Sequence, residues 1–151
     1  MQQVNVLLDN LKMYLRRRGD LSNEVWVYRP PTGISVRDAG DKGVGVFAER
    51  TFREGELVGE CPVLIVRQEA QVHLARALDV RNYDFGEYLF AWGRRSAAFP
   101  MGWAAFLNHL DDPNLEYAPV HNQHIITFTA RRRIGFLEEL TIDYGFDPAA
   151  D

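Results

Sequence analysis

The sequence contains little cysteine, little lysine and no long apolar run. Among 151 residues there is one cysteine, Cys61, which excludes an internal disulfide and a zinc site made of clustered cysteines. No apolar stretch approaches the roughly 20 residues of a membrane span, and the N-terminus does not resemble a signal peptide. We therefore expect a cytoplasmic protein without a membrane partner. The only lysines are Lys12 and Lys42, so arginine supplies most of the positive charge.

Composition and charge are those of an ordinary globular domain. Hydrophobic residues make up 46% of the chain and charged residues 25%, and the formal net charge is −4. This acidic balance argues against direct binding of nucleic acid and suits a basic partner. The length fits one domain, and no linker or low-complexity tract divides it.

The N-terminal segment carries a helical pattern. Apolar residues recur with helical spacing near residues 3–18, which predicts an amphipathic helix. Arg16, Arg17 and Arg18 then fall in its last turn, where cations suit the helix dipole, and Gly19 can end it. A nucleic-acid or localisation role for these arginines is the less favoured interpretation. We assign residues 1–24 to this helix and its lead-in.

From residue 25 onward the pattern changes to short β-rich runs separated by Pro, Gly and Asp clusters. One helix is expected near Gln68–Leu78, where a partial apolar stripe repeats. We therefore predict a mainly β domain over residues 25–151 with one short helical insertion. The expected strands are Val25–Tyr28, Gly45–Ala48, Leu57–Val66, Tyr88–Trp92 and Ile125–Ala130.

Two segments contain residues suited to binding a ligand. Gly43 and Gly45 are two residues apart, which lets the backbone turn tightly and approach a ligand, although a plain hairpin bend also explains them. Further along, an apolar run delivers Asn108 and His109 into a turn. Both side chains can donate and accept hydrogen bonds, which suits a polar cofactor.

Two tyrosines follow these segments. Tyr117 stands at the start of a probable strand, and Tyr144 precedes Gly145 and Phe146 near the C-terminus. Taken singly, each tyrosine is best interpreted as a core aromatic with its hydroxyl satisfied. Neither tyrosine indicates a function without knowledge of its neighbours in the fold.

Metal chemistry is the weaker alternative, and no metal site is expected. His109, Asp111 and Asp112 are adjacent on one turn without a second cluster to complete a coordination sphere. His121 and His124 fit the polar tip of a hairpin better than a metal pair.

Taken in order, these segments resemble the SET domain of protein lysine methyltransferases, over about residues 33–147. The resemblance is to the minimal SET proteins of bacteria, without the cysteine-rich tail that binds zinc in many relatives. Several motifs in the family's order and spacing carry it: Lys42–Ala48, Gly55–Val58, Tyr88–Phe90, Asn108-His109 with Pro113-Asn114, and Glu139–Tyr144.

The resemblance implies a compact SET fold of small β-sheets with a knot-like C-terminal threading. It also implies S-adenosylmethionine as cofactor and methyl transfer to a lysine of a protein substrate, which the acidic charge suggests is basic. Tyr144 is then the catalytic tyrosine. The implied cofactor-binding residues are Lys42, Gly43, Gly45, Asn108, His109, Tyr144 and Phe146, and the implied lysine channel consists of Tyr117, Ile142 and Phe146.

The chain departs from the family pattern at Ala105, where Arg or Ser is frequent, and at Leu110–Asp111, where Ser or Cys often follows the histidine. A further departure is Leu137, where the family often has glycine in a turn. These changes motivate a second hypothesis, a catalytically silent SET fold that acts as a binding module. A third hypothesis, an unrelated metal enzyme using the histidines, is the least favoured.

Overall fold

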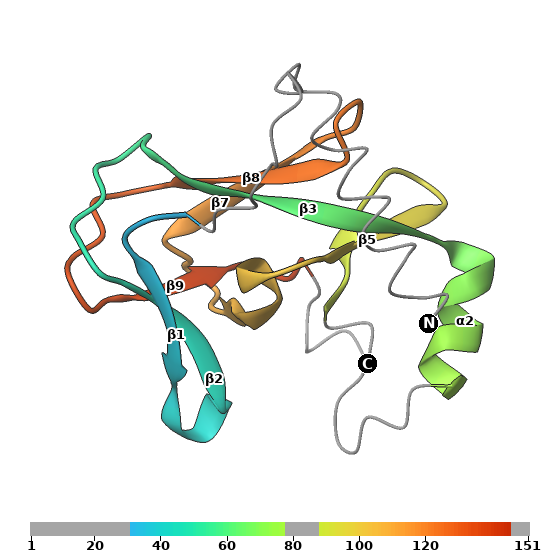
Figure 1. Cartoon of the computed structure of the whole chain (residues 1–151), viewed down its shortest axis with the longest axis horizontal. Coiled ribbons are helices and arrows are strands. Elements are labelled where there is room, and N and C mark those ends of the chain that lie inside the picture. Colours follow the sequence, from blue (N-terminus) through green and yellow to red (C-terminus); the bar gives the residue numbers. More distant parts are fainter. Residues whose placement is uncertain (1–30, 78–87, 146–151) are drawn as a thin grey trace, which may run out of the picture.

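A computed structural model of the protein describes residues 31–77 and 88–145. The predicted helix near residues 3–18, the predicted strand Val25–Tyr28 and Phe146 lie outside these residues. Within them, strands dominate, which confirms the mainly β prediction (Figure 1). The elements are β1 (Ile34–Asp38), η1 (Gly40–Lys42), β2 (Val44–Ala48), β3 (Leu57–Arg67), α2 (Gln68–Ala77), β4 (Phe90–Ala91), β5 (Ser96–Pro100), η3 (Trp103–Phe106), β6 (Asn108–His109), β7 (Leu115–Val120), β8 (Ile125–Ala130) and β9 (Glu139–Ile142).

The strands form two sheets, with the orders β1-β2-β9-β6 and β4-β5-β3-β8-β7. The long strand β3 is the centre of the larger sheet: its first half pairs with β8 and its second half with β5, both antiparallel. β8 buries four of its six residues: Ile126, Phe128 and Ala130 alternate along one face, and Ile125 at the start of the strand is buried as well. Strand β3 continues directly into α2 at one end of the molecule (Figure 1).

The C-terminal strand β9 lies between β2 and β6 in the smaller sheet. It pairs antiparallel with β2 and parallel with β6, where Asn108 lies opposite Thr141 and His109 opposite Ile142. Parallel neighbours need a long crossover, and here the β7–β8 hairpin lies within it. The two segments that carry the Asn-His and closing motifs are therefore side by side.

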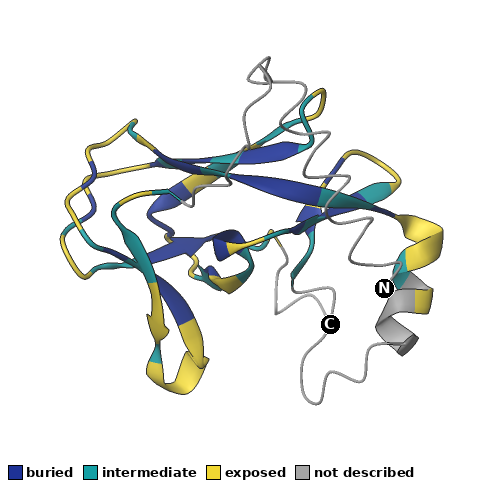
Figure 2. Ribbon diagram, in the orientation of Figure 1, coloured by how far each residue is buried: buried dark blue, intermediate teal, exposed yellow. Residues whose placement is uncertain are grey.

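The core lies between the two sheets and is mainly aromatic and β-branched. Phe52, Phe128, Ile134 and Leu140 are completely buried, and Figure 2 shows β3, β8 and β9 as largely buried strands. Trp103 packs edge-on against Phe128, with 4.9 Å between the ring centroids. This contact packs the short helix η3 against β8.

The predicted strands Gly45–Ala48, Leu57–Val66 and Ile125–Ala130 and the predicted helix are confirmed by β2, β3, β8 and α2. The prediction of a strand over Tyr88–Trp92 was too long, because only Phe90–Ala91 pairs with β5. The Trp92 N–H donates to the carbonyl of Ser96, the first residue of β5, at 3.2 Å and closes the turn between β4 and β5. No helix in the described part of the chain has the length and apolarity to cross a bilayer.

Candidate active site

A cleft of about 550 Å³ opens beside the Asn-His segment. Its walls come from the turn before β2, from the start of β4, from η3 with β6, and from the residues after β9. Five of the predicted cofactor-binding residues line it, namely Lys42, Gly43, Asn108, His109 and Tyr144. Exposed apolar side chains at Val44 and Phe106 form another part of the wall.

Asn108 is held in one orientation by β2 and β9. Its Nδ2 donates to the Val44 carbonyl at 3.1 Å and to Glu139 Oε1 at 2.7 Å. Both amide hydrogens are therefore used, and only Oδ1 is left to accept a hydrogen bond from a ligand. The second Glu139 oxygen, Oε2, accepts a hydrogen bond from Lys42 Nζ at 3.0 Å. Glu139 therefore also holds the Lys42 ammonium group at the edge of the cleft.

Gly45 lies beneath this network rather than in the cleft wall. A Cβ built on Gly45 would be 2.9 Å from Glu139 Oε1 and 3.0 Å from Asn108 Nδ2, so at least the Glu139 carboxylate would have to shift. The close approach of these side chains accounts for the glycine, and its predicted role in binding a cofactor stays a prediction. Gly43 has a φ of 78°, which only glycine adopts readily, and it turns the chain from η1 into β2.

His109 connects the cleft to the closing motif. Its Nδ1 accepts the Tyr144 backbone N–H at 3.2 Å, so Nε2 carries the proton and donates to Asp111 Oδ1 at 3.0 Å. Both ring nitrogens are engaged within the protein. His109 therefore positions the backbone of Tyr144, and any contact with a cofactor would use its ring face or its main chain.

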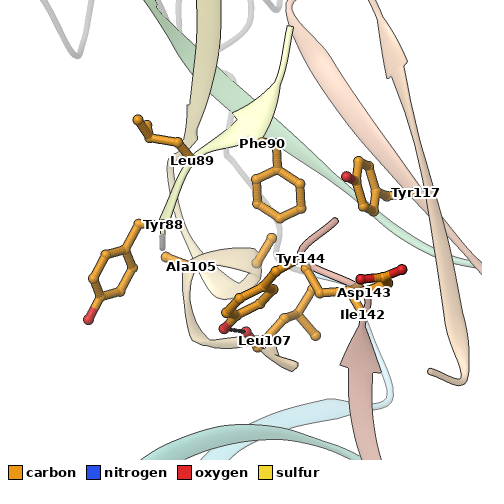
Figure 3. Close-up of a pocket in the computed structure, with 10 residues that line it drawn as sticks. Tyr88, Leu89, Phe90, Ala105, Leu107, Tyr117, Ile142, Asp143 and Tyr144 are labelled. Carbon is orange, nitrogen blue, oxygen red and sulfur yellow. Dashed lines mark hydrogen bonds between the residues drawn. The ribbon is translucent and has the colours of Figure 1, made fainter. Parts of the chain in front are cut away.

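A second, narrower pocket of about 20 Å³ adjoins the cleft (Figure 3). Volume of this size holds roughly one water molecule. Aromatic rings form much of its wall. Two of them, Phe90 and Tyr117, pack edge-on with 4.9 Å between the ring centroids. The predicted channel residues Tyr117 and Ile142 both line it, beside Asp143 and Tyr144.

Tyr144 lies at the junction of the two hollows. Tyr88, Ala105, Leu107 and Tyr144 line both the cleft and the narrow pocket. The Tyr144 hydroxyl donates to the Leu107 carbonyl at 2.7 Å, which fixes the phenol between them. Ala105 stands at the same junction, where its small side chain replaces the larger polar residue expected from the family pattern.

The ionisation of Tyr117 is set by its surroundings. Burial raises the pKa of the Tyr117 phenol, and the negative charge of Asp143 raises it further. The phenol therefore keeps its proton at neutral pH, and its oxygen can act as a hydrogen-bond donor within the narrow pocket.

Asn114 is a structural residue whose role was missed by sequence reasoning. It is almost completely buried, and its Nδ2 donates to the Glu139 carbonyl at 2.7 Å and to Glu138 Oε1 at 3.1 Å. Its Oδ1 accepts the Thr141 N–H at 2.9 Å. Glu139 was also assigned no role. Both residues belong to motifs of the family resemblance, but the contacts that explain them join segments far apart in the sequence.

The remaining candidate residues from the sequence are two histidines, His121 and His124. His121 and His124 lie in the turn between β7 and β8, as the hairpin interpretation predicts. The His121 ring packs edge-on against Trp92, with 4.6 Å between the ring centroids. Across the described residues, no group of three or more His, Cys, Asp or Glu side chains is arranged to hold a metal ion.

The cleft and the narrow aromatic pocket meet at Tyr144, in a domain built from two β-sheets. The sequence profile of the SET domain family matches residues 43–145, and the chain belongs to this family. No curated protein sequence matches the chain.

Solved structures share the fold. One is a Plasmodium falciparum protein proposed to be a histone methyltransferase, with a TM-score of 0.56 and 22% identity over 76% of this chain and 98% of that chain. A second is a humanized mutant of the Chaetomium thermophilum Polycomb Repressive Complex 2 bound to the inhibitor GSK126, with a TM-score of 0.60 and 22% identity. The apo, autoinhibited form of ctPRC2 has a TM-score of 0.62 and 25% identity. This chain spans only 15% of the length of each of the two complex chains, and 74% of it is covered.

Proposed function

We propose that this protein is an S-adenosylmethionine-dependent methyltransferase that modifies lysine side chains of a basic protein. One observation carries the proposal: the cleft and the narrow aromatic pocket share the wall around Tyr144. A methyl donor in the cleft and a lysine amine in the pocket would meet there. Alignment of the two reactants is the main requirement for transfer of a methyl group.

The residues of the cleft fit S-adenosylmethionine. Its volume falls within the range of about 300–1,000 Å³ that small-molecule sites occupy. Asn108 Oδ1 would accept a hydrogen bond from an amino group of the cofactor, and the exposed Phe106 and Val44 offer apolar surface to its ring system. Lys42 and Gly43 would bind it through their backbone, and we extend the site to Phe146.

Bound S-adenosylmethionine would supply an electrophilic methyl group on a sulfonium. The protein's own residues would position the two reactants and remove water from the lysine amine. The hydrogen bond from the Tyr144 O–H to the Leu107 carbonyl fixes the phenol, which would lie beside the reacting groups and stabilise their charge distribution. The lysine amine, with a reference pKa of about 10.4, must lose its proton, and the apolar walls of Phe90 and Ile142 favour the neutral form.

The test uses S-adenosylmethionine labelled in its methyl group, the purified protein and a panel of lysine-rich proteins. We expect label on lysine with the wild type and a loss of about a hundredfold in rate with Tyr144→Phe, since one oriented polar group is removed. Asp112→Asn is the matched control, because Asp112 is exposed and lines neither hollow. Equal rates for wild type and Tyr144→Phe would contradict the assigned role of Tyr144.

A catalytically silent binding module is the second candidate. It is favoured by Ala105, which leaves the junction of the two hollows without the polar side chain frequent in the family. Under this hypothesis no acceptor is labelled, and Ala105→Ser or Ala105→Arg would restore transfer. Labelling by the wild type eliminates the silent module.

A further inference from the structure

Asp143 is the only formally charged residue among those that line the narrow pocket in the described chain. Its side chain is 59% exposed, so the carboxylate lies at the rim rather than at the bottom. Its Oδ1 accepts the Gly145 N–H at 2.8 Å, which fixes its orientation. In Figure 3 the carboxylate lies on the same side of the pocket as Tyr117.

The groups around Asp143 do not neutralise it. Among the described residues, no lysine or arginine forms an ion pair with it. His109 Nδ1 lies 3.8 Å from Asp143 Oδ1, but this nitrogen accepts the Tyr144 N–H and carries no proton. Among the described residues that line the pocket, the other titratable groups are the phenols of Tyr88, Tyr117 and Tyr144. Asp143 raises the pKa of Tyr117, which agrees with its place on the wall of the pocket.

We propose that Asp143 is a specificity-determining residue that captures the charged ammonium form of the substrate lysine at the rim of the narrow pocket. This inference rests on the proposed function. An unpaired carboxylate beside aromatic walls attracts a cation, and it discriminates against neutral side chains of similar size. The pocket has room for roughly one water, so the captured ammonium would lie beside the carboxylate at the rim while the carbon stem extends outwards.

Capture by a carboxylate has a cost for the chemical step. The same charge that binds the ammonium opposes loss of its proton. Asp143 therefore lowers KM for a lysine substrate and does not raise kcat at neutral pH. Replacement by asparagine keeps an oxygen for the Gly145 N–H and removes only the charge, so the fold around the rim is preserved.

The binding test uses two small probes and the full chain with labelled tyrosine rings. n-Butylammonium reproduces the end of a lysine side chain, and 1-butanol is its neutral counterpart. NMR titrations follow the Tyr117 and Tyr144 signals. We expect the wild type to prefer n-butylammonium by about five- to tenfold, and this preference to weaken in high salt. Asp143→Asn should abolish the preference, and Asp112→Asn should keep it.

The inference is overturned if the wild type binds both probes equally, binds neither, or keeps its preference in Asp143→Asn. None of these measurements requires methyl transfer. A protein that transfers methyl groups but keeps its preference in Asp143→Asn refutes this inference alone. A protein that prefers n-butylammonium through Asp143 but never binds S-adenosylmethionine refutes the proposed function instead. In an active enzyme, Asp143→Asn should raise KM at least fivefold with unchanged or higher kcat.

Discussion

Tyr117 lies across the narrow pocket from Tyr144 (Figure 3). Under the proposed function it would limit the space around a bound lysine amine. With a pocket volume of about 20 Å³, little room remains for added methyl groups. We predict that the wild type yields mainly monomethyllysine. Tyr117→Phe removes the hydroxyl and should shift the product towards di- and trimethyllysine, which mass spectrometry of the acceptor measures. Trimethyllysine as the main product of the wild type would contradict this prediction.

Leu137 has a strained backbone conformation that should lower the stability of the fold. Its φ is 64°, a left-handed conformation that costs a side-chain-bearing residue about 1–2 kcal/mol, and its side chain is 47% exposed. The family's glycine at this turn avoids the strain. Leu137→Gly should raise the free energy of unfolding by about 0.5–1 kcal/mol, because the relief exceeds the entropic cost of glycine.

Denaturant unfolding measures this change, and Phe136→Gly is its control. Phe136 is 62% exposed and, unlike Leu137, is not among the described non-glycine residues with positive φ. There, glycine only adds entropy to the unfolded chain, so the control should lose stability. If Leu137→Gly loses as much stability as Phe136→Gly, the turn is not strained.

At the scale of elements, β9 depends on Asn114. This buried side chain bonds to Glu138, to the Glu139 carbonyl and to the Thr141 N–H, so it connects the turn before β7 with β9. Asn114→Ala leaves buried polar groups without partners, and we predict a loss of about 2–4 kcal/mol in the free energy of unfolding.

Hydrogen exchange can locate the effect of Asn114→Ala. Protection should fall first at β9 and β6, which pair with each other. Asp112→Ala, in the same turn but exposed, should change stability by less than about 0.5 kcal/mol. Unchanged protection at β9 in Asn114→Ala would show that other contacts hold the strand.

The helices and strands that were predicted correctly are those that patterns among neighbouring residues determine. β8 and α2 were predicted because alternation and helical spacing are properties of neighbouring residues. The order of the strands was not predicted from such patterns, and the SET resemblance alone placed the two motifs together. Contacts such as Lys42 with Glu139, separated by 97 positions, have no local signal. For the same reason the sequence indicated Asn108 but not the carboxylate that orients it.

At the scale of the whole molecule, carboxylates make stability depend on pH. Burial raises the pKa of Glu138, but hydrogen bonds from the Gly135 N–H, Arg132 and Asn114 outweigh it and hold this pKa below the usual value of 4.5. The Arg53 N–H and the Arg50 side chain likewise lower the pKa of Glu56.

A carboxyl whose pKa is lower in the folded state stabilises the fold above its unfolded pKa, and that contribution is lost as the pH falls. We therefore predict constant carboxylate-linked stability above about pH 5 and a progressive loss below it. Thermal unfolding measured at several pH values tests this, and Glu138→Gln should have a shallower acid dependence than the wild type. An identical slope for both proteins would exclude Glu138 as a contributor.

The central claim is that the cleft beside Asn108 binds S-adenosylmethionine. Calorimetric titration of the purified protein tests it most directly, because no knowledge of the acceptor protein is needed. We predict saturable binding to the wild type and at least about tenfold weaker binding to Asn108→Ala, which loses an oriented acceptor. Asp112→Asn should bind like the wild type. Absence of saturable binding to the wild type, or equal affinity for Asn108→Ala, would contradict the account.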